Sequence, residues 1–457
     1  MKIDDSRSFL AWAFFCVLGV ALTACGGGGG GGGGEDDGGG PITSGDYVVL
    51  AWNDLGMHCL NPTYDRLVIL PPYNTLWAQV IERGDPPRIV TAGIEVQYAI
   101  VGNTTSLNKL FYDQFWDPPV LVLFNAPGLL PDTGLNLRDP SVHNGLSGTM
   151  QQVGDHFQAD GIPVTPVRDG TTTKDPYQVA QITVKNTGGT TLVQTRAMVP
   201  TSDEINCGRC HAAGGTITQI FNDILTVHDA GTGSHLSIDT PVLCASCHGS
   251  PVLGASDPGT SGLYLSEAIH GFHAGRTAPG GGAIACYDCH PGNQTQCSRS
   301  LRHTAADGNC TECHGNMANV AGTITSGRVP WETEPKCVAC HTGVQGVDTG
   351  TTLYRNDTGH GGVYCAGCHQ SPHAMVPSRE ATDNYQALQY QDAAVTIASC
   401  AACHDNSRGE DEGISGFRET HAGSNPEHRS ACSVCHTALP ADVSAAQFPH
   451  QFTWHAR

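Results

Sequence analysis

The sequence predicts a mixed fold, with an antiparallel, sandwich-like β-domain over residues 46–200 followed by a loop-rich part with short helices over residues 201–457. Alternating apolar and polar residues indicate strands in the first part. In the second part Gly, His and Cys become dense and strand patterns vanish. This part has too little aliphatic side chain for an ordinary hydrophobic core, so another group must fill its interior.

Residues 1–24 have the character of a secretory signal peptide. Phe9–Leu22 is apolar but too short for a comfortable membrane span. The stretch ends in Leu22-Thr23-Ala24-Cys25, which resembles the lipobox of bacterial lipoprotein signal peptides. The resemblance implies lipidation of Cys25 and, because Gly26 follows it, sorting to the outer membrane. An uncleaved anchor is the alternative, because the side chains of the n-region sum to zero charge.

Residues 25–45 are predicted to form a flexible tether behind the lipidated cysteine. Nine consecutive glycines begin at Gly26, and such a segment cannot bury a core. A tether of this kind suits a globular body that a lipid holds at a membrane.

Five segments are the predicted strands of the β-domain. Ile94–Ile100 alternates between apolar and polar side chains, as a half-buried strand does. Residues 186–189 (Asn-Thr-Gly-Gly) have turn chemistry and predict a hairpin between their neighbours. The other segments are Tyr47–Trp52, Val120–Phe124, Val179–Lys185 and Leu192–Met198. The role of this domain stays open between docking a partner, binding a ligand and bracing the second part.

The pattern Cys-x-x-Cys-His occurs eight times after residue 200. One helical turn separates the two thiols, so both can reach the vinyl groups of one haem while the adjacent imidazole faces the iron. In chain order these are motif 1 (Cys207, Cys210, His211), motif 2 (Cys244, Cys247, His248), motif 3 (Cys286, Cys289, His290), motif 4 (Cys310, Cys313, His314), motif 5 (Cys337, Cys340, His341), motif 6 (Cys365, Cys368, His369), motif 7 (Cys400, Cys403, His404) and motif 8 (Cys432, Cys435, His436).

Zinc binding and redox thiols are the alternative roles for these cysteines. A zinc site built from Cys pairs has no fixed His after each second Cys, and a thioredoxin-like pair occurs once on a βαβ scaffold. The motifs instead resemble those of the multihaem c-type cytochromes of metal-reducing and related bacteria, many of which are outer-surface lipoproteins. This resemblance covers about residues 201–457 and implies eight covalently attached haem c groups that form most of the core. Residues 53–59 (Asn-Asp-Leu-Gly-Met-His-Cys) also resemble a segment found in front of some such cytochromes.

Each haem iron needs a second axial ligand. The second part holds eleven histidines outside the motifs, and this excess over eight haems permits every haem to have two histidine ligands. The candidates are His228, His235, His270, His273, His303, His360, His373, His421, His428, His450 and His455. His270 and His273 are one helical turn apart and could serve two haems, whereas His228 and His235 are expected to supply one ligand between them. Met317 and Met375 are alternative ligands, since a Met ligand raises the haem potential.

Two further thiols, Cys59 and Cys297, remain in the mature chain. In an oxidising compartment such a pair predicts a disulfide, which would link the β-domain to the second part. The alternatives are a small metal or redox site at His58 and Cys59, or two buried thiols.

Charge and ligation narrow the function. The net charge of −20 argues against binding to nucleic acid and favours cationic or neutral partners. If histidine ligates every iron on both sides, electron transfer is favoured over catalysis. The cytochrome resemblance implies redox-protein donors and acceptors, an outer-membrane location and an external metal or mineral acceptor. Two alternatives stay open, an octahaem reductase of nitrogen or sulfur oxyanions with one open haem, and a subunit of a haem filament.

Overall fold

A computed structural model of the chain describes residues 45–404, except residues 85, 292–293, 304–309 and 342–350. The described residues all belong to one structural unit, which begins after Gly40. Cys25 and its glycine tether, motif 8, and the candidate ligands His421, His428, His450 and His455 lie outside the described residues. Their roles therefore stay predictions.

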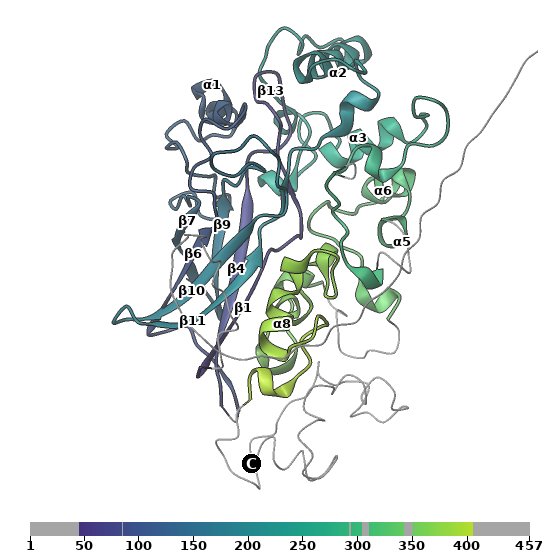
Figure 1. Ribbon diagram of the computed structural model, residues 1–457. Coiled ribbons are helices and arrows are strands. Elements are labelled where there is room, and N and C mark those ends of the chain that lie inside the picture. The colour runs from purple at the N-terminus through teal and green to yellow at the C-terminus, as the bar shows by residue number, and fades with distance from the viewer. Residues whose placement is uncertain (1–44, 85, 292–293, 304–309, 342–350, 405–457) are drawn as a thin grey trace, which may run out of the picture. The chain divides into compact units, whose positions relative to one another are not determined.

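Two antiparallel sheets form the β-rich part (Figure 1). Sheet 1 has the strand order β1-β4-β9-β8, with β5 beside β4, and sheet 2 has the order β11-β10-β6-β7. Sheet 1 consists of β1 (Tyr47–Trp52), β4 (Asn74–Glu82), β5 (Arg88–Ile89), β8 (Gln151–Val153) and β9 (His156–Ile162). Sheet 2 consists of β6 (Ile94–Ile100), β7 (Ser147–Thr149), β10 (Val179–Asn186) and β11 (Thr191–Met198). Four of the five predicted strands and the predicted β10–β11 hairpin are confirmed.

The two sheets share one hydrophobic core. Alternate residues of the longer strands enter it, including Val96 and Tyr98 of β6 and Ile182 and Val184 of β10. Because successive side chains of a strand point to opposite faces, this alternation brings one face of each sheet into the core. Two antiparallel sheets around one core agree with the antiparallel, sandwich-like β-domain that the sequence predicts.

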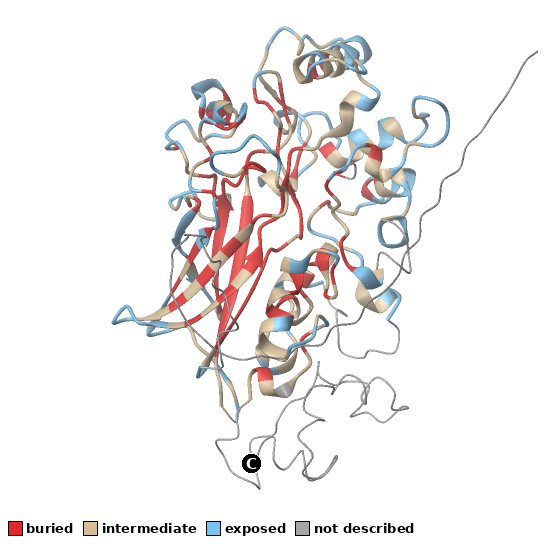
Figure 2. Ribbon diagram, viewed as in Figure 1, coloured by how far each residue is buried: buried red, intermediate tan, exposed pale blue. Residues whose placement is uncertain are grey.

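Strands β1, β4 and β9 of sheet 1 are buried on both faces. Val49 and Ala51 of β1 belong to the core between the sheets, whereas Val48, Leu50 and Trp52 belong to a second core on the other face. That second core is completed from the motif-bearing part by Tyr354, Tyr364, Ala366, Val376, Ala387, Ile397 and Ala402. Sheet 1 is therefore a middle layer, and Figure 2 shows its strands as the most continuous buried region.

Strand β1 is at the end of sheet 1, and helix α8 (Tyr385–Gln391) covers the edge of β1 that pairs with no other strand of the sheet. The Gln386 side chain accepts from the Ala51 N–H (2.9 Å) and donates to the Ala51 carbonyl. One turn later, the Tyr390 hydroxyl accepts from the Val49 N–H (3.1 Å) and donates to the Val49 carbonyl (2.9 Å). Side chains of the motif-bearing part thus satisfy backbone groups that an edge strand would leave unpaired.

The predicted strand Val120–Phe124 is wrong, because residues 120–123 lie in helix α1 (Pro118–Leu123) and Phe124 is the residue that caps its end. Two prolines occupy the first helical positions, where a missing N–H costs nothing and the fixed φ is already helical. The apolar run then buries Val120 and Leu121 in a small cluster with Phe115.

The motif-bearing part is loop-rich with short helices, as predicted (Figure 1). Its helices are α2 (Ile217–Thr232), α3 (Leu265–His273), α5 (Thr311–His314), α6 (Met317–Thr325), α7 (Cys365–His369) and α8, and its single-turn 3-10 segments include Asn206–Arg209, Cys244–Ser246, Cys286–Asp288, Cys337–Ala339, His360–Gly362, Pro372–Ala374 and Cys400–Ala402. Two short parallel pairs join it to the β-rich part, β2 (His58–Cys59) with β12 (Thr201–Ser202) and β3 (Leu67–Val68) with β13 (Val242–Leu243). None of the described helices has both the length and the apolar character needed to span a bilayer.

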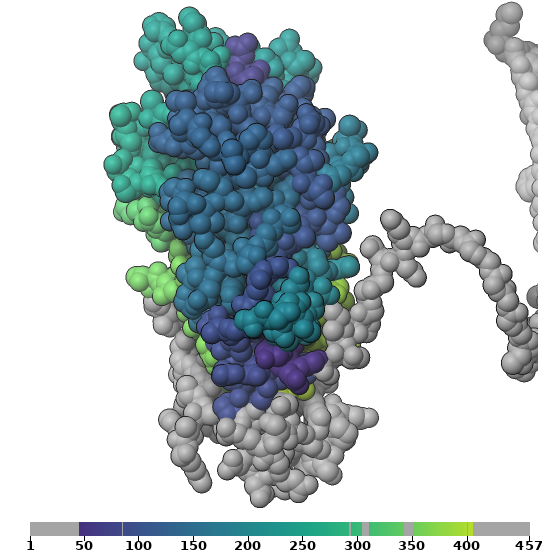
Figure 3. Space-filling view, turned by 90° about the vertical axis from the view of Figure 1, so that its left-hand side faces the viewer, coloured from purple at the N-terminus to yellow at the C-terminus, as the bar shows by residue number. Residues whose placement is uncertain are grey.

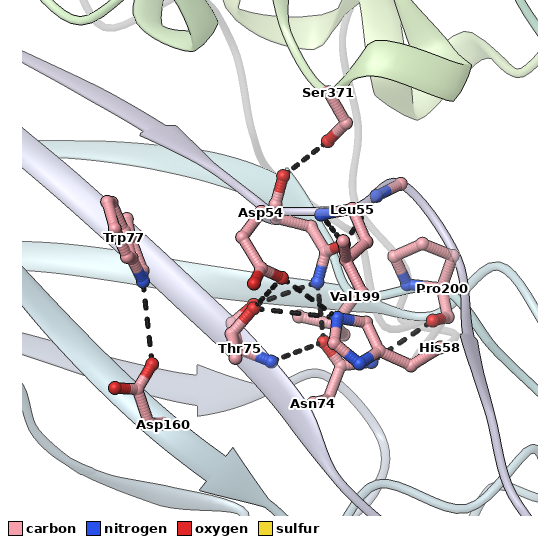
Figure 4. Close-up of polar contacts among 12 residues, drawn as sticks. Asp54, Leu55, His58, Asn74, Thr75, Trp77, Asp160, Val199, Pro200 and Ser371 are labelled. Carbon is pink, nitrogen blue, oxygen red and sulfur yellow. Dashed lines mark hydrogen bonds and ion pairs between the residues drawn. The ribbon is translucent and has the colours of Figure 1, made fainter. Parts of the chain in front are cut away.

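Residues 53–59, called loop 53–59 below, carry a buried polar network (Figure 4). His58 Nε2 donates to Asp54 Oδ1 (3.0 Å), and the Thr75 hydroxyl donates to the same carboxylate. Burial alone would raise the pKa of Asp54, but these hydrogen bonds and the charge of His58 hold that pKa below the ordinary 3.8. The network ties the loop to β4 of sheet 1.

Truncation of the core between the sheets should lower stability. Val184→Ala removes a fully buried side chain, and we expect it to reduce the free energy of unfolding by about 2 kcal/mol, from lost burial plus a cavity. Val153→Ala is the matched control, because Val153 is 40% exposed and such changes cost under about 0.5 kcal/mol. Urea unfolding followed by far-UV circular dichroism compares the two. Equal costs would contradict the core assignment.

The Asp54 network should make stability depend on acid pH. Because folding lowers the pKa of Asp54 from 3.8, its stabilisation is complete above that pH and is lost as the pH falls through the folded-state pKa. Asp54→Asn should therefore cost about 2 kcal/mol near neutral pH, and this difference from wild type should shrink below about pH 4. Unfolding free energies across that range test this, with exposed Asp113→Asn as control. A difference that stays constant with pH would refute it.

Candidate functional site

The described motifs share one local structure. Motifs 2, 3, 5 and 7 each begin with a single 3-10 turn, and the 3-10 turn of motif 1 starts one residue earlier, at Asn206. Motif 4 contains α5, and motif 6 forms α7. In motif 1 the His211 N–H donates to the Cys207 carbonyl (2.9 Å), and the equivalent bond in motif 5 joins His341 to Cys337 (2.8 Å). One turn thus closes each of these two motifs between its first cysteine and its histidine.

A single cavity of 4780 Å³ runs through the motif-bearing part and along sheet 1. An ordinary ligand pocket has a volume of about 300–1,000 Å³, so this space suits several large groups. Its walls include the cysteines and histidines of motifs 1 to 6 and Cys403 and His404 of motif 7. Figure 2 shows the accompanying contrast, with most of the motif-bearing part only half-buried or exposed. In Figure 3 the β-rich part makes up most of the visible face, and later residues in green emerge along its left edge.

Six motif histidines each face a second histidine across this cavity. The ring centroids are 6.4 Å apart for His211–His273, 6.3 Å for His248–His228, 5.9 Å for His290–His270, 6.3 Å for His314–His373, 6.2 Å for His341–His303 and 6.1 Å for His404–His360. Every pair joins one motif histidine to one candidate distal ligand. The structure thus brings together six of the seven distal candidates that it describes.

The spacing of the pairs fits two imidazoles on opposite sides of one metal ion. A metal–imidazole bond is about 2 Å long, so rings in line across the metal have centroids about 6 Å apart, whereas tetrahedral coordination gives about 5 Å. The observed range is 5.9–6.4 Å. Within the described residues, no three His, Cys, Asp or Glu side chains converge as a zinc site requires. The donor set therefore suits axial haem ligation better than zinc.

Hydrogen bonds at Nδ1 orient many of these rings. On α3, His270 donates to the Ser266 carbonyl (2.6 Å) and His273 to the Ile269 carbonyl (2.7 Å). His373 donates to the Leu55 carbonyl (2.9 Å). Because a carbonyl only accepts, Nδ1 carries the proton, and Nε2 is left with the lone pair that a metal needs.

His211 has a charged partner at Nδ1. It donates to the Asp223 carboxylate of α2 (2.9 Å). A carboxylate polarises the ring more strongly than a carbonyl does and makes Nε2 a stronger donor. Sequence reasoning missed this residue, because Asp223 has no motif spacing to His211 and approaches it only through the fold of α2.

Burial keeps the central rings neutral. It lowers the pKa of His290 to about 4, with added repulsion from the neighbouring His270, His314 and His373. The pKa values of those three histidines are also lowered, in each case first by burial. A neutral imidazole is the form that binds a metal, so this cluster favours ligation at ordinary pH.

The candidate ligands differ in whether they line the cavity. His228 lines the cavity, whereas His235, the other member of that predicted pair, does not. Met317 and Met375 also line the cavity, and Met375 packs against the second core. His369 of motif 6 is a wall residue as well.

The motifs have a spatial order that differs from the chain order. Motifs 1 and 3 are adjacent. Arg209 forms an ion pair with Asp288, and the pKa of Cys207 is raised by burial and then by the charge of Cys289. Motif 2 adjoins motif 1 through Cys244 and Cys207, motif 4 adjoins motif 3 through Cys310 and Cys286, and motif 7 adjoins motif 6 through Cys403 and Cys368. Burial raises the pKa of Tyr354, and the charges of Cys365 of motif 6 and Cys337 of motif 5 raise it further. Motifs 5 and 6 therefore both lie near Tyr354.

One short segment connects three motifs. Residues 360–373 contain His360, which faces motif 7, then motif 6 itself, then His373, which faces motif 4. The spatial series is therefore 2–1–3–4–6–7, with motif 5 beside motif 6.

Cys59 and Cys297 are neighbours at the wall of the cavity. Burial raises the pKa of Cys59 to about 12, and burial and the charge of Cys59 raise the pKa of Cys297. Both residues are free thiols in the structure. The disulfide therefore stays a prediction, although the fold brings its two partners together.

Comparisons with known proteins leave the family open. No family model matches the chain, and no curated protein matches it. Among solved structures, the chain is similar to MtrC from Shewanella baltica OS185, with 11% sequence identity, a TM-score of 0.15 and coverage of 64% of this chain and 43% of that chain. The chain thus spans less than half the length of this neighbour, and so low a TM-score does not establish a common fold. Membership of the multihaem cytochromes stays a prediction that rests on the motifs and the paired histidines.

Proposed function

We propose that this protein is a multihaem c-type cytochrome that transfers electrons and is not itself a reductase. The observation that carries this proposal is the set of six histidine pairs, each joining a motif to a distal residue at 5.9–6.4 Å. Haem attached at these motifs would supply reversible one-electron chemistry at its iron. At these six motifs, histidine on both sides would leave no coordination position for a substrate, which favours transfer over catalysis.

The chain's own residues perform three tasks in this proposal. The motif cysteines would anchor each haem, the paired histidines would ligate the iron, and hydrogen bonds at Nδ1 orient the rings and set their donor strength. Sheet 1 closes one side of the cavity and excludes water there through residues such as Leu50 and Ile81. The continuous cavity and the spatial series of motifs support transfer between neighbouring sites.

The proposal extends to location and partners. We propose a lipid anchor at Cys25 with a glycine tether, an outer-membrane location, and eight haems once motif 8 is included. The lipobox-like sequence supports the anchor, and the net charge of −20 favours cationic or neutral redox proteins. A metal or mineral acceptor outside the cell completes the proposed route.

Removing a proposed distal ligand should change the spin state of one haem. His228→Ala should give the oxidised holoprotein one high-spin haem, because His228 faces His248 at 6.3 Å. His235→Ala is the matched control and should stay low-spin, because His235 does not line the cavity. Electron paramagnetic resonance and optical spectra provide the measurement.

The wild-type spectrum tests the proposal as a whole. A stoichiometric high-spin haem that binds nitrite or cyanide in the unmodified holoprotein would favour the reductase instead. A high-spin haem in His235→Ala but not in His228→Ala would contradict the assigned pairing.

The Asp223 carboxylate should lower the potential of the haem at motif 1. Its hydrogen bond to His211 strengthens the ligand and stabilises oxidised iron. Asp223→Asn should raise that potential by roughly 60 mV, a tenfold change in a one-electron equilibrium. Asp257→Asn removes an equal charge from an exposed site that accepts from Gly259 N–H, and it serves as control in a spectroelectrochemical titration. Identical titrations for both variants would refute the role of Asp223.

A further inference from the structure

Loop 53–59 belongs to the β-rich part, yet it contacts a proposed haem ligand. His373 Nδ1 donates to the Leu55 carbonyl at 2.9 Å, and the His373 ring faces His314 of motif 4 with centroids 6.3 Å apart. The hydrogen bond joins residues more than 300 positions apart in the chain. The tautomer of His373 is therefore set by a backbone atom of the other part of the protein.

The backbone at Leu55 is tied to sheet 1 through the Asn53 side chain. Asn53 Oδ1 accepts from the N–H groups of Leu55 (3.2 Å) and Gly56 (2.7 Å), which closes the loop on itself. Asn53 Nδ2 in turn donates to Asn74 Oδ1 (2.7 Å) and to the Thr75 carbonyl (2.9 Å) of β4. Asn53 thus transmits the position of a central strand to the acceptor of His373.

A second contact lies two residues before the ligand. The Ser371 hydroxyl donates to the Asn53 carbonyl at 2.5 Å (Figure 4). Gly56 packs against the same segment. A Cβ added at Gly56 would lie 3.0 Å from Ser371 Cβ and 3.4 Å from His373 Cβ. The φ of Gly56 is +83°, a conformation that favours glycine. The close approach of loop and ligand therefore requires glycine at this position.

Arg299 fixes the backbone on both sides of this contact. The backbone N–H of Arg299 donates to the His373 carbonyl (2.7 Å), and the Nη1 atom of its side chain donates to the Gly56 carbonyl (2.6 Å). The guanidinium is buried and bound by both oxygens of Asp383, at 2.8 and 3.1 Å. Loop, ligand segment and Arg299 therefore form one hydrogen-bonded assembly.

We propose that loop 53–59 positions His373, so that the β-rich part is a working part of the haem site at motif 4 and not only a brace. Leu55 is the positioning residue, because its carbonyl orients the ring and, by accepting from Nδ1, strengthens Nε2 as a donor. A stronger donor stabilises oxidised iron and lowers the potential of that haem. This inference rests on the proposed function, since it takes His373 as an iron ligand.

The test is Gly56→Ala in the full-length holoprotein. The added methyl group pushes the loop from Ser371 and His373, so the hydrogen bond to Leu55 weakens and one haem should titrate at a higher potential. We expect a roughly tenfold shift in its oxidation equilibrium, which is 59 mV for one electron. Gly93→Ala is the matched control, because Gly93 has a similar φ of +77° with nothing within 4 Å of the added Cβ.

A second variant covers the case in which Gly56→Ala fails to fold. Ser371→Ala removes only the hydrogen bond to the Asn53 carbonyl and should give a smaller shift in the same direction. The planes of His314 and His373 are 29° apart, so the low-spin resonance signal of a near-parallel ligand pair should change with the potential. A purely structural role would lower stability without moving either readout.

His373→Ala separates the two levels of inference. One high-spin haem in this variant supports His373 as a ligand, and a wholly low-spin spectrum would overturn the ligand pairing of the proposed function. If His373→Ala is high-spin while Gly56→Ala and Ser371→Ala titrate like Gly93→Ala, the role of the loop alone is refuted.

Discussion

The distance between paired histidine rings is the constraint on which the rest of the structure depends. Rings whose centroids are 5.9–6.4 Å apart do not touch, so neither ring can hold the other. Each ring must be oriented by a hydrogen bond at Nδ1, to a carbonyl such as that of Ser266 or Leu55 or to the Asp223 carboxylate. Those acceptors are themselves positioned by helices and by loop 53–59.

Sheet 1 supplies the rigidity that the motif-bearing part lacks. In its strand β1, Val49 and Ala51 lie in the core between the sheets. Leu50 and Trp52 lie in the second core, which the motif-bearing part completes. In return, Gln386 pairs with the free edge of the same strand. The two parts thus satisfy each other's apolar faces and backbone groups, which explains how a segment dense in Gly and His packs against an ordered surface.

The arrangement of the motifs has functional consequences. Residues 360–373 contribute to three haem sites in the proposed function, so a movement of this segment would alter motifs 4, 6 and 7 together. The charged hydrogen bond of Asp223 at motif 1 and the neutral one of Leu55 at motif 4 would give these haems different potentials. In the proposed function, local hydrogen bonding, rather than ligand type, would then set the order of the haem potentials.

Short-range patterns were enough to identify the eight motifs and to predict the β1, β6, β10 and β11 strands and the loop-rich character of the described residues after 200. These features depend on neighbouring residues, and even the error at Val120–Phe124 was local, since Pro118 and Pro119 start a helix. The pairing of ligands could not be predicted in this way. His303 precedes motif 4 in the chain yet faces His341 of motif 5, and Leu55 meets His373 across the protein. A metal site requires proximity in space, and that proximity arises only when segments distant in the chain pack together.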